Sequence, residues 1–147
     1  MSNVVIRGSS TTIEDWERAN RATRKELPNL TGEEKEVSRK LGISEEDYAR
    51  NRLAMQYGQE RLRNRVEILR TKLTDLVKAL DENVNVVLLS FDVWQDEYTV
   101  SLKKNHREIR CKFPRELGND ILDSSDQSSL AVLKKRLKNA IQEACLV

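Results

Sequence analysis

The spacing of apolar positions divides the chain into a helical first half and a second half rich in strands. The strongest periodic signal has apolar residues at alternating intervals of four and three, which is the a/d spacing of a coiled-coil seam. This seam consists of Leu62, Val66, Leu69, Leu73, Leu76 and Leu80. We expect one helix over residues 45–81, on the order of 50 Å long at about 1.5 Å per residue.

The N-terminal segment carries a start signal and a stop signal for a first helix. Thr11 followed by Glu14 matches a capping box, in which each side chain bonds the backbone N–H of the other residue. Pro28 cannot continue a helix and disfavours helical geometry at the residue before it. The sequence therefore predicts a helix over residues 12–26, preceded by a flexible N-terminus over residues 1–10.

A second capping box marks the start of the next helix. Thr31 and Glu34 repeat the pattern, and Gly42 stands where a glycine commonly ends a helix in the left-handed conformation. These signals predict a helix over residues 32–41. Gly58 lies inside the long helix and costs up to about 1 kcal/mol relative to alanine, so we expect a kink or a break there.

β-Branched and aromatic residues dominate the chain from Val84 onward. Their alternation with polar residues predicts half-buried strands over residues 84–94, 97–103 and 107–113, joined by short polar turns. Short connections favour an antiparallel meander. Pro114 then opens a short helix, and a last helix carries an apolar stripe that covers one face of the sheet.

These elements predict an α+β fold in three parts. Residues 1–10 form a flexible N-terminus, residues 11–81 a helical arm that ends in the long coiled-coil-like helix, and residues 84–147 a β-β-β-α-α module. The module is expected to be a three-stranded antiparallel meander covered by the C-terminal helices. A chain of 147 residues suits one domain or one small domain with a helical extension.

Composition and charge narrow the function classes only slightly. The chain is 38% hydrophobic and 34% charged, with a formal net charge of +2. That near-neutral balance favours no particular partner. The sequence has neither an apolar stretch long enough to cross a bilayer nor the apolar core of a signal peptide at its start. We therefore expect a cytoplasmic protein with no membrane partner.

The inventory of reactive groups argues against catalysis. The single histidine, His106, falls in an expected turn, and the two cysteines, Cys111 and Cys145, match no zinc-binding spacing. Glycine-rich phosphate-binding motifs and nucleophile-elbow motifs are missing. The sequence therefore predicts a protein that is not an enzyme, with no catalytic residues, no metal, no cofactor and no evident small-molecule substrate.

The seam is the candidate partner-binding site. Leucine-rich burial could supply about 1.5 to 3 kcal/mol per side chain on a matching surface. Eight cations and three anions lie between Arg50 and Lys78, and cations flank the seam. Copies paired along the seam would therefore repel. Either the seam packs on the chain's own N-terminal helices or on an acidic surface of another protein or copy, or the leucines pack internally.

If the leucines pack internally, the basic side chains that flank the seam could bind a polyanion. The alternative function is thus sequence-indifferent nucleic-acid binding, in which cations contact phosphates. The candidate residues are Arg61, Arg63, Arg65, Arg70 and Lys72. No aromatic residues are interleaved with these arginines, as binders of single strands usually require. A third interpretation is an ordinary solvated face whose charges pair along the helix.

Residues 30–50 resemble a short helix-turn-helix segment that recurs in Mu-like phage proteins of capsid assembly. That segment has Leu-Thr, an acidic pair, an apolar helix, Leu-Gly-Ile and an acidic capped helix. The matching residues are Leu30, Thr31, Glu33, Glu34, Val37, Leu41, Gly42, Ile43, Glu45, Glu46 and Tyr48. The strand-rich half has no counterpart in that group, so the resemblance implies only a structural role associated with a virion or mobile element.

Overall fold

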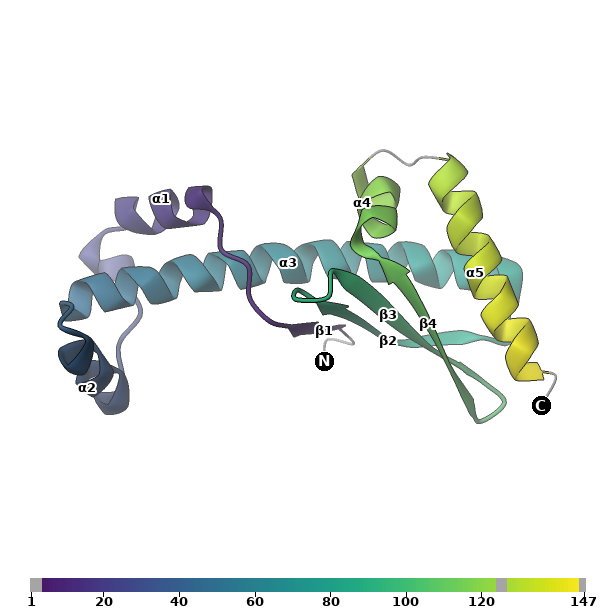
Figure 1. Cartoon of the computed structure of the whole chain (residues 1–147), viewed down its shortest axis with the longest axis horizontal. Coiled ribbons are helices and arrows are strands. Elements are labelled where there is room, and N and C mark those ends of the chain that lie inside the picture. The colour runs from purple at the N-terminus through teal and green to yellow at the C-terminus, as the bar shows by residue number, and fades with distance from the viewer. Residues whose placement is uncertain (1–3, 124–126, 146–147) are drawn as a thin grey trace. The chain divides into compact units, whose positions relative to one another are not determined.

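The computed structural model describes residues 4–123 and 127–145 and has an α+β fold (Figure 1). The chain forms two compact units. Unit 1 comprises Met1–Gly8 and Arg63–Val147, and unit 2 comprises Ser9–Leu62. The long helix α3 (Glu45–Leu80) belongs to both units, because the boundary between them falls inside it. The sequence predicts a division after residue 81, whereas the compact units divide between Leu62 and Arg63.

Unit 1 is built on a four-stranded sheet in the order β1-β2-β3-β4. The strands β2 (Asn85–Asp92), β3 (Glu97–Lys104) and β4 (Arg107–Pro114) form the expected antiparallel meander. The prediction of three strands is wrong, because β1 (Val4–Arg7) pairs with β2 in parallel. The sheet is therefore mixed and not purely antiparallel.

The strand β1 also corrects the prediction of a flexible N-terminus. Val4, Val5 and Ile6 are β-branched residues, which fit a pleated strand well. Val4 is 6% exposed, so the strand contributes to the core. The flexible segment predicted over residues 1–10 is therefore wrong for residues 4–7, and residues 1–3 lie outside the described part of the chain.

Helices cover one face of the sheet. Figure 1 shows α4 (Arg115–Asp123), α5 (Gln127–Cys145) and the C-terminal half of α3 on the same side of it. The alternating side chains of the strands point to that face and are buried. They include Leu89, Phe91, Tyr98, Val100, Leu102, Ile109, Cys111 and Phe113. Three of these form an aromatic row, with ring centroids 4.6 Å apart for Phe91 and Tyr98 and 5.1 Å apart for Tyr98 and Phe113.

Unit 2 is helical. It contains α1 (Ile13–Arg21), the 3₁₀ turn η1 (Arg24–Glu26), α2 (Gly32–Leu41) and the first half of α3. The first helix is shorter than predicted, because α1 ends at Arg21 and a separate turn follows. Its capping box uses Thr12 and Asp15, one residue later than predicted. Both pairs have the same spacing, but a capping box usually ends in Glu or Gln, so the sequence pattern favoured Thr11 with Glu14.

The connection from α2 to α3 agrees with the predicted signals. Thr31 and Glu34 form the expected capping box, and Gly42 ends α2 in the left-handed conformation with φ of 73°. The helix does not break at Gly58, because α3 is one helix from Glu45 to Leu80. A Cβ at Gly58 would overlap the backbone carbonyl of Ser10. The glycine therefore permits a close approach of two backbones inside unit 2.

Candidate interaction surfaces

Most of the predicted partner-binding seam lies in the core of unit 1. Val66, Leu69, Leu73 and Leu76 are between 0% and 9% exposed, and Leu62 and Leu80 are half-buried. Leu69 lies against α4, since a Cβ built on Gly118 would be 3.3 Å from its Cδ2 atom. The leucine stripe is thus covered by the chain's own elements, so Val66, Leu69 and Leu73 are not accessible to a partner here.

The cations beside the seam are used to hold α4. The Arg65 guanidinium donates to both carboxylate oxygens of Asp123, at 3.1 and 3.2 Å, and to the side-chain oxygen of Asn119 at 2.9 Å. These hydrogen bonds keep the pKa of the Asp123 carboxyl below its ordinary value. About two turns after Arg65 on α3, the Lys72 ammonium donates a hydrogen bond to the carbonyl of Ile121 at 3.1 Å. Cationic flanks that would repel another copy of α3 are therefore matched by α4.

The other candidate nucleic-acid residues differ from one another. The Arg61 guanidinium bonds the Asp15 carboxylate at 3.1 Å within unit 2. Arg63 is exposed. Arg70 is half-buried, and its Nε is buried without a hydrogen-bond partner among the described residues. Intrachain contacts of Arg61, Arg65 and Lys72 compete with phosphate contacts, and nucleic-acid binding by these cations stays a prediction.

The core of unit 2 is small and made largely of alanine. Its buried members are Ala19, Ala22, Leu53 and Ala54, with Leu27 and Tyr57 packed against them. Arg50 supplements this core, because its guanidinium donates to the carbonyls of Ala19 at 2.9 Å and Ala22 at 2.8 Å. These carbonyls lie at the C-terminal end of α1, where helix carbonyls commonly need donors from outside the helix.

Several large apolar side chains of unit 2 lie on its surface. Ile13 is 77% exposed and Leu41 is 65% exposed. Three others, Trp16, Val37 and Met55, are 38% to 49% exposed. These side chains remain outside the small core of unit 2.

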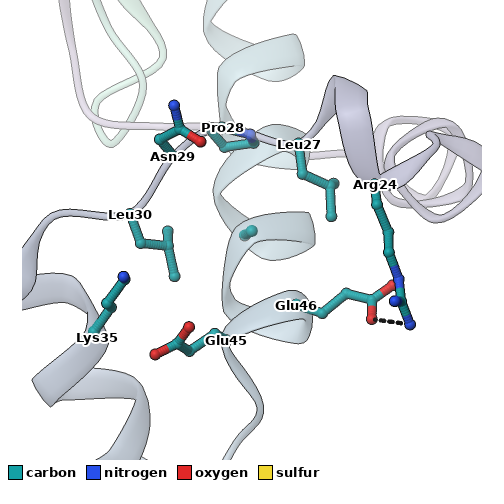
Figure 2. A pocket seen from close by; sticks show the side chains of 9 residues that line it. Arg24, Leu27, Pro28, Asn29, Leu30, Lys35, Glu45 and Glu46 are labelled. Carbon is teal, nitrogen blue, oxygen red and sulfur yellow. Dashed lines mark ion pairs between the residues drawn. The ribbon is translucent and has the colours of Figure 1, made fainter.

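A groove of about 580 Å³ lies within unit 2, between the segment that follows η1 and the first turns of α3 (Figure 2). Leu27 and Leu30 extend into it from an extended segment that contains Pro28. Ala49, which is 4% exposed, forms its floor on α3. The sequence analysis used Pro28 only as a stop signal. The sequence signal that could have predicted an apolar loop is the pair of leucines close to that proline, Leu27 and Leu30.

Charged side chains border the groove on two sides. Figure 2 shows Lys35 and Glu45 on one side of the leucines and Arg24 with Glu46 on the other. The Arg24 and Glu46 side chains form an ion pair at 3.5 Å. A hydrogen bond from Arg50 and the charge of Arg24 keep the pKa of the Glu46 carboxyl below its ordinary value. The groove therefore combines an apolar floor with fixed charges of both signs.

The groups singled out for chemistry, Cys111 and His106, belong to unit 1. Cys111 is buried on β4, and burial raises the pKa of its thiol. His106 is exposed in the turn between β3 and β4. Within residues 4–123 and 127–145, no cluster of three or more His, Cys, Asp or Glu residues could hold a metal ion. No helix in the same part of the chain is long and apolar enough to cross a membrane.

Comparison with known proteins found no relative of this chain. No family model, no curated protein and no solved structure matches this chain.

Proposed function

We propose that the protein is a non-catalytic interaction protein that binds a segment of another protein in the groove of unit 2. The observation that carries this proposal is the combination of an open groove lined by the apolar residues Leu27, Leu30 and Ala49 with charged side chains on both sides. A groove of this composition suits a peptide that inserts an apolar side chain and pairs its own charges with the border.

The long helix remains the docking element in this proposal. The contact lies on its first two turns, which supply Glu45, Glu46 and Ala49, and not on the leucine seam. The seam stabilises unit 1, whereas the alanine-rich core of unit 2 leaves larger apolar side chains outside. The resemblance of residues 30–50 to Mu-like phage proteins favours a partner in phage or mobile-element assembly.

Selection from a displayed library of random 12-residue peptides tests the proposal on the full chain. We expect enriched peptides to share a bulky apolar residue with charged residues beside it. Reversing the charge of Lys35 with Lys35→Glu should weaken their binding about tenfold, since one lost charge-assisted contact costs about 1.4 kcal/mol.

Lys40→Glu is the matched control, because Lys40 is an exposed lysine of the same helix that does not line the groove. Binding to this variant should equal binding to the unchanged chain. Peptides that bind all three proteins equally, or a selection that enriches no peptide, would contradict the proposal.

A further inference from the structure

A second groove, of about 410 Å³, lies inside unit 1 where α3, α4 and α5 meet. Its walls are mostly apolar and include Leu76 and Ala79 from α3, Ile121 from α4 and Leu130 from α5. Pockets for small molecules commonly have volumes of about 300–1,000 Å³ and such apolar walls with a few polar groups. The groove is therefore large enough for a small ligand.

The polar groups of the groove carry an excess of positive charge. Lys72 and Lys134 line it together with one acid, Asp75. The carbonyl of Ile121 accepts one hydrogen bond from the Lys72 ammonium and so holds this cation at the groove. An ammonium has three donors, so Lys72 can also bind a ligand. Lys134 is exposed on α5, and its long side chain can reach over the opening.

We infer that this groove binds a small amphiphilic anion, namely an acyl chain with a carboxylate head. The apolar walls would cover the acyl chain of the ligand. Removal of the acyl chain's surface from water would favour this binding. The two lysines would bind the carboxylate by charge-assisted hydrogen bonds. A cationic head would lose this attraction, so the groove should discriminate by charge among ligands with the same chain. The inference concerns unit 1 and does not depend on the proposed function of unit 2.

Calorimetric titration of the full chain with decanoate, below the concentration at which decanoate aggregates, tests the inference. We expect saturable binding of decanoate and at least tenfold weaker binding of decylammonium, which has the same chain and the opposite charge. Lys134→Gln should weaken decanoate binding by about threefold to tenfold, as loss of a charged hydrogen bond does. Lys138→Gln is the matched control, since Lys138 is an exposed lysine on the same helix outside the groove.

A second variant tests the position of the acyl chain. Ala79 is exposed at the groove, so Ala79→Trp should fill it with little effect on the core. We expect this variant to keep the helix content seen by circular dichroism and to lose decanoate binding. Undetectable binding of decanoate to the unchanged chain would overturn the inference. Equal binding of decanoate and decylammonium, or binding that both Lys134→Gln and a folded Ala79→Trp retain, would also overturn it.

Discussion

Unit 1 and unit 2 bury different kinds of side chain. The core of unit 1 contains large residues that are fully enclosed, such as Leu69, Leu73 and Phe113. The core of unit 2 consists of three alanines and one leucine, with Leu27 and Tyr57 at its edge. Burial of a large apolar side chain contributes about 1.5–3 kcal/mol, and an alanine contributes much less because it removes less surface from water.

Unit 2 therefore depends more on directional polar contacts. Capping boxes begin α1 and α2, the Arg50 guanidinium binds carbonyls at the end of α1, and Arg61 pairs with Asp15. Such contacts place helices well but add only about 0.5–3 kcal/mol each. The difference indicates that buried large apolar side chains stabilise unit 1. Unit 2, in contrast, has apolar side chains on its surface that can contact a partner.

The largest expected effect comes from removing a core side chain of unit 1. Leu69 is 0% exposed, and its neighbour Ile68 is 53% exposed on the same helix. Leu69→Ala should lower the free energy of unfolding of unit 1 by about 2–5 kcal/mol, because it leaves a cavity. Urea unfolding, monitored by hydrogen exchange of α4 and β3, measures the change in the free energy of unfolding.

Ile68→Ala is the control and should change that free energy by less than about 0.5 kcal/mol. Equal losses for the two substitutions would show that the leucine seam is not the core of unit 1.

An intermediate effect is expected in unit 2 at Gly58. Alanine normally favours a helix over glycine. Gly58→Ala should nevertheless destabilise unit 2 by about 1–3 kcal/mol, because the new Cβ overlaps the Ser10 carbonyl and forces the backbones apart. Hydrogen exchange of α1 and of the first half of α3 reports the loss.

Gly32→Ala serves as the comparison, because a Cβ there meets nothing within 4 Å. It should be neutral or stabilising, by at most about 1 kcal/mol. A stabilising Gly58→Ala would mean that Ser10 does not approach the helix as described.

The smallest effect is expected from an ion pair of unit 1. The Lys104 ammonium binds the Asp81 carboxylate at 2.7 Å, and this hydrogen bond with that from the Asn83 backbone holds the pKa of Asp81 below its ordinary value of 3.8. A lowered pKa in the folded state adds stability above pH 3.8 and loses it as the pH falls through the lowered value.

Asp81→Asn should therefore make the loss of stability on acidification below pH 3.8 shallower, as measured by urea unfolding at several pH values. Glu116→Gln, at an exposed carboxyl with no ion pair in the described part of the chain, should leave the acid dependence unchanged. If stability depends on pH in the same way for Asp81→Asn and for the unchanged chain, this ion pair does not contribute to the acid dependence.

Elements with local signals at both ends were predicted accurately. The helix predicted over residues 32–41 is α2 itself, because Thr31 caps its start and Gly42 ends it. The long helix was predicted to within one residue, because its apolar residues repeat at helical spacing over several turns. The start of α1 was displaced by one residue, because Thr11 with Glu14 matches the usual capping box, whereas the structure uses Thr12 with Asp15.

Two features that depend on distant partners were not predicted. The four residues of β1 are too few for a periodic signal, and their partner strand begins at Asn85. The groove of unit 2 was missed for a similar reason. Leu27 and Leu30 become its walls only because the chain folds against Ala49 and Glu45 of α3.

The amino-acid sequence by itself determined most of the helices and three of the four strands of the sheet, because capping residues, glycines and apolar periods act over a few residues. It also determined that the stripe from Leu62 to Leu80 needs cover, since its side chains are apolar and its flanks repel their own copies. Only the tertiary structure decided that the sheet and α4 provide this cover, with Asp123 matching Arg65. Packing partners far apart in the chain are selected by the sum of many contacts, and no local pattern contains that sum.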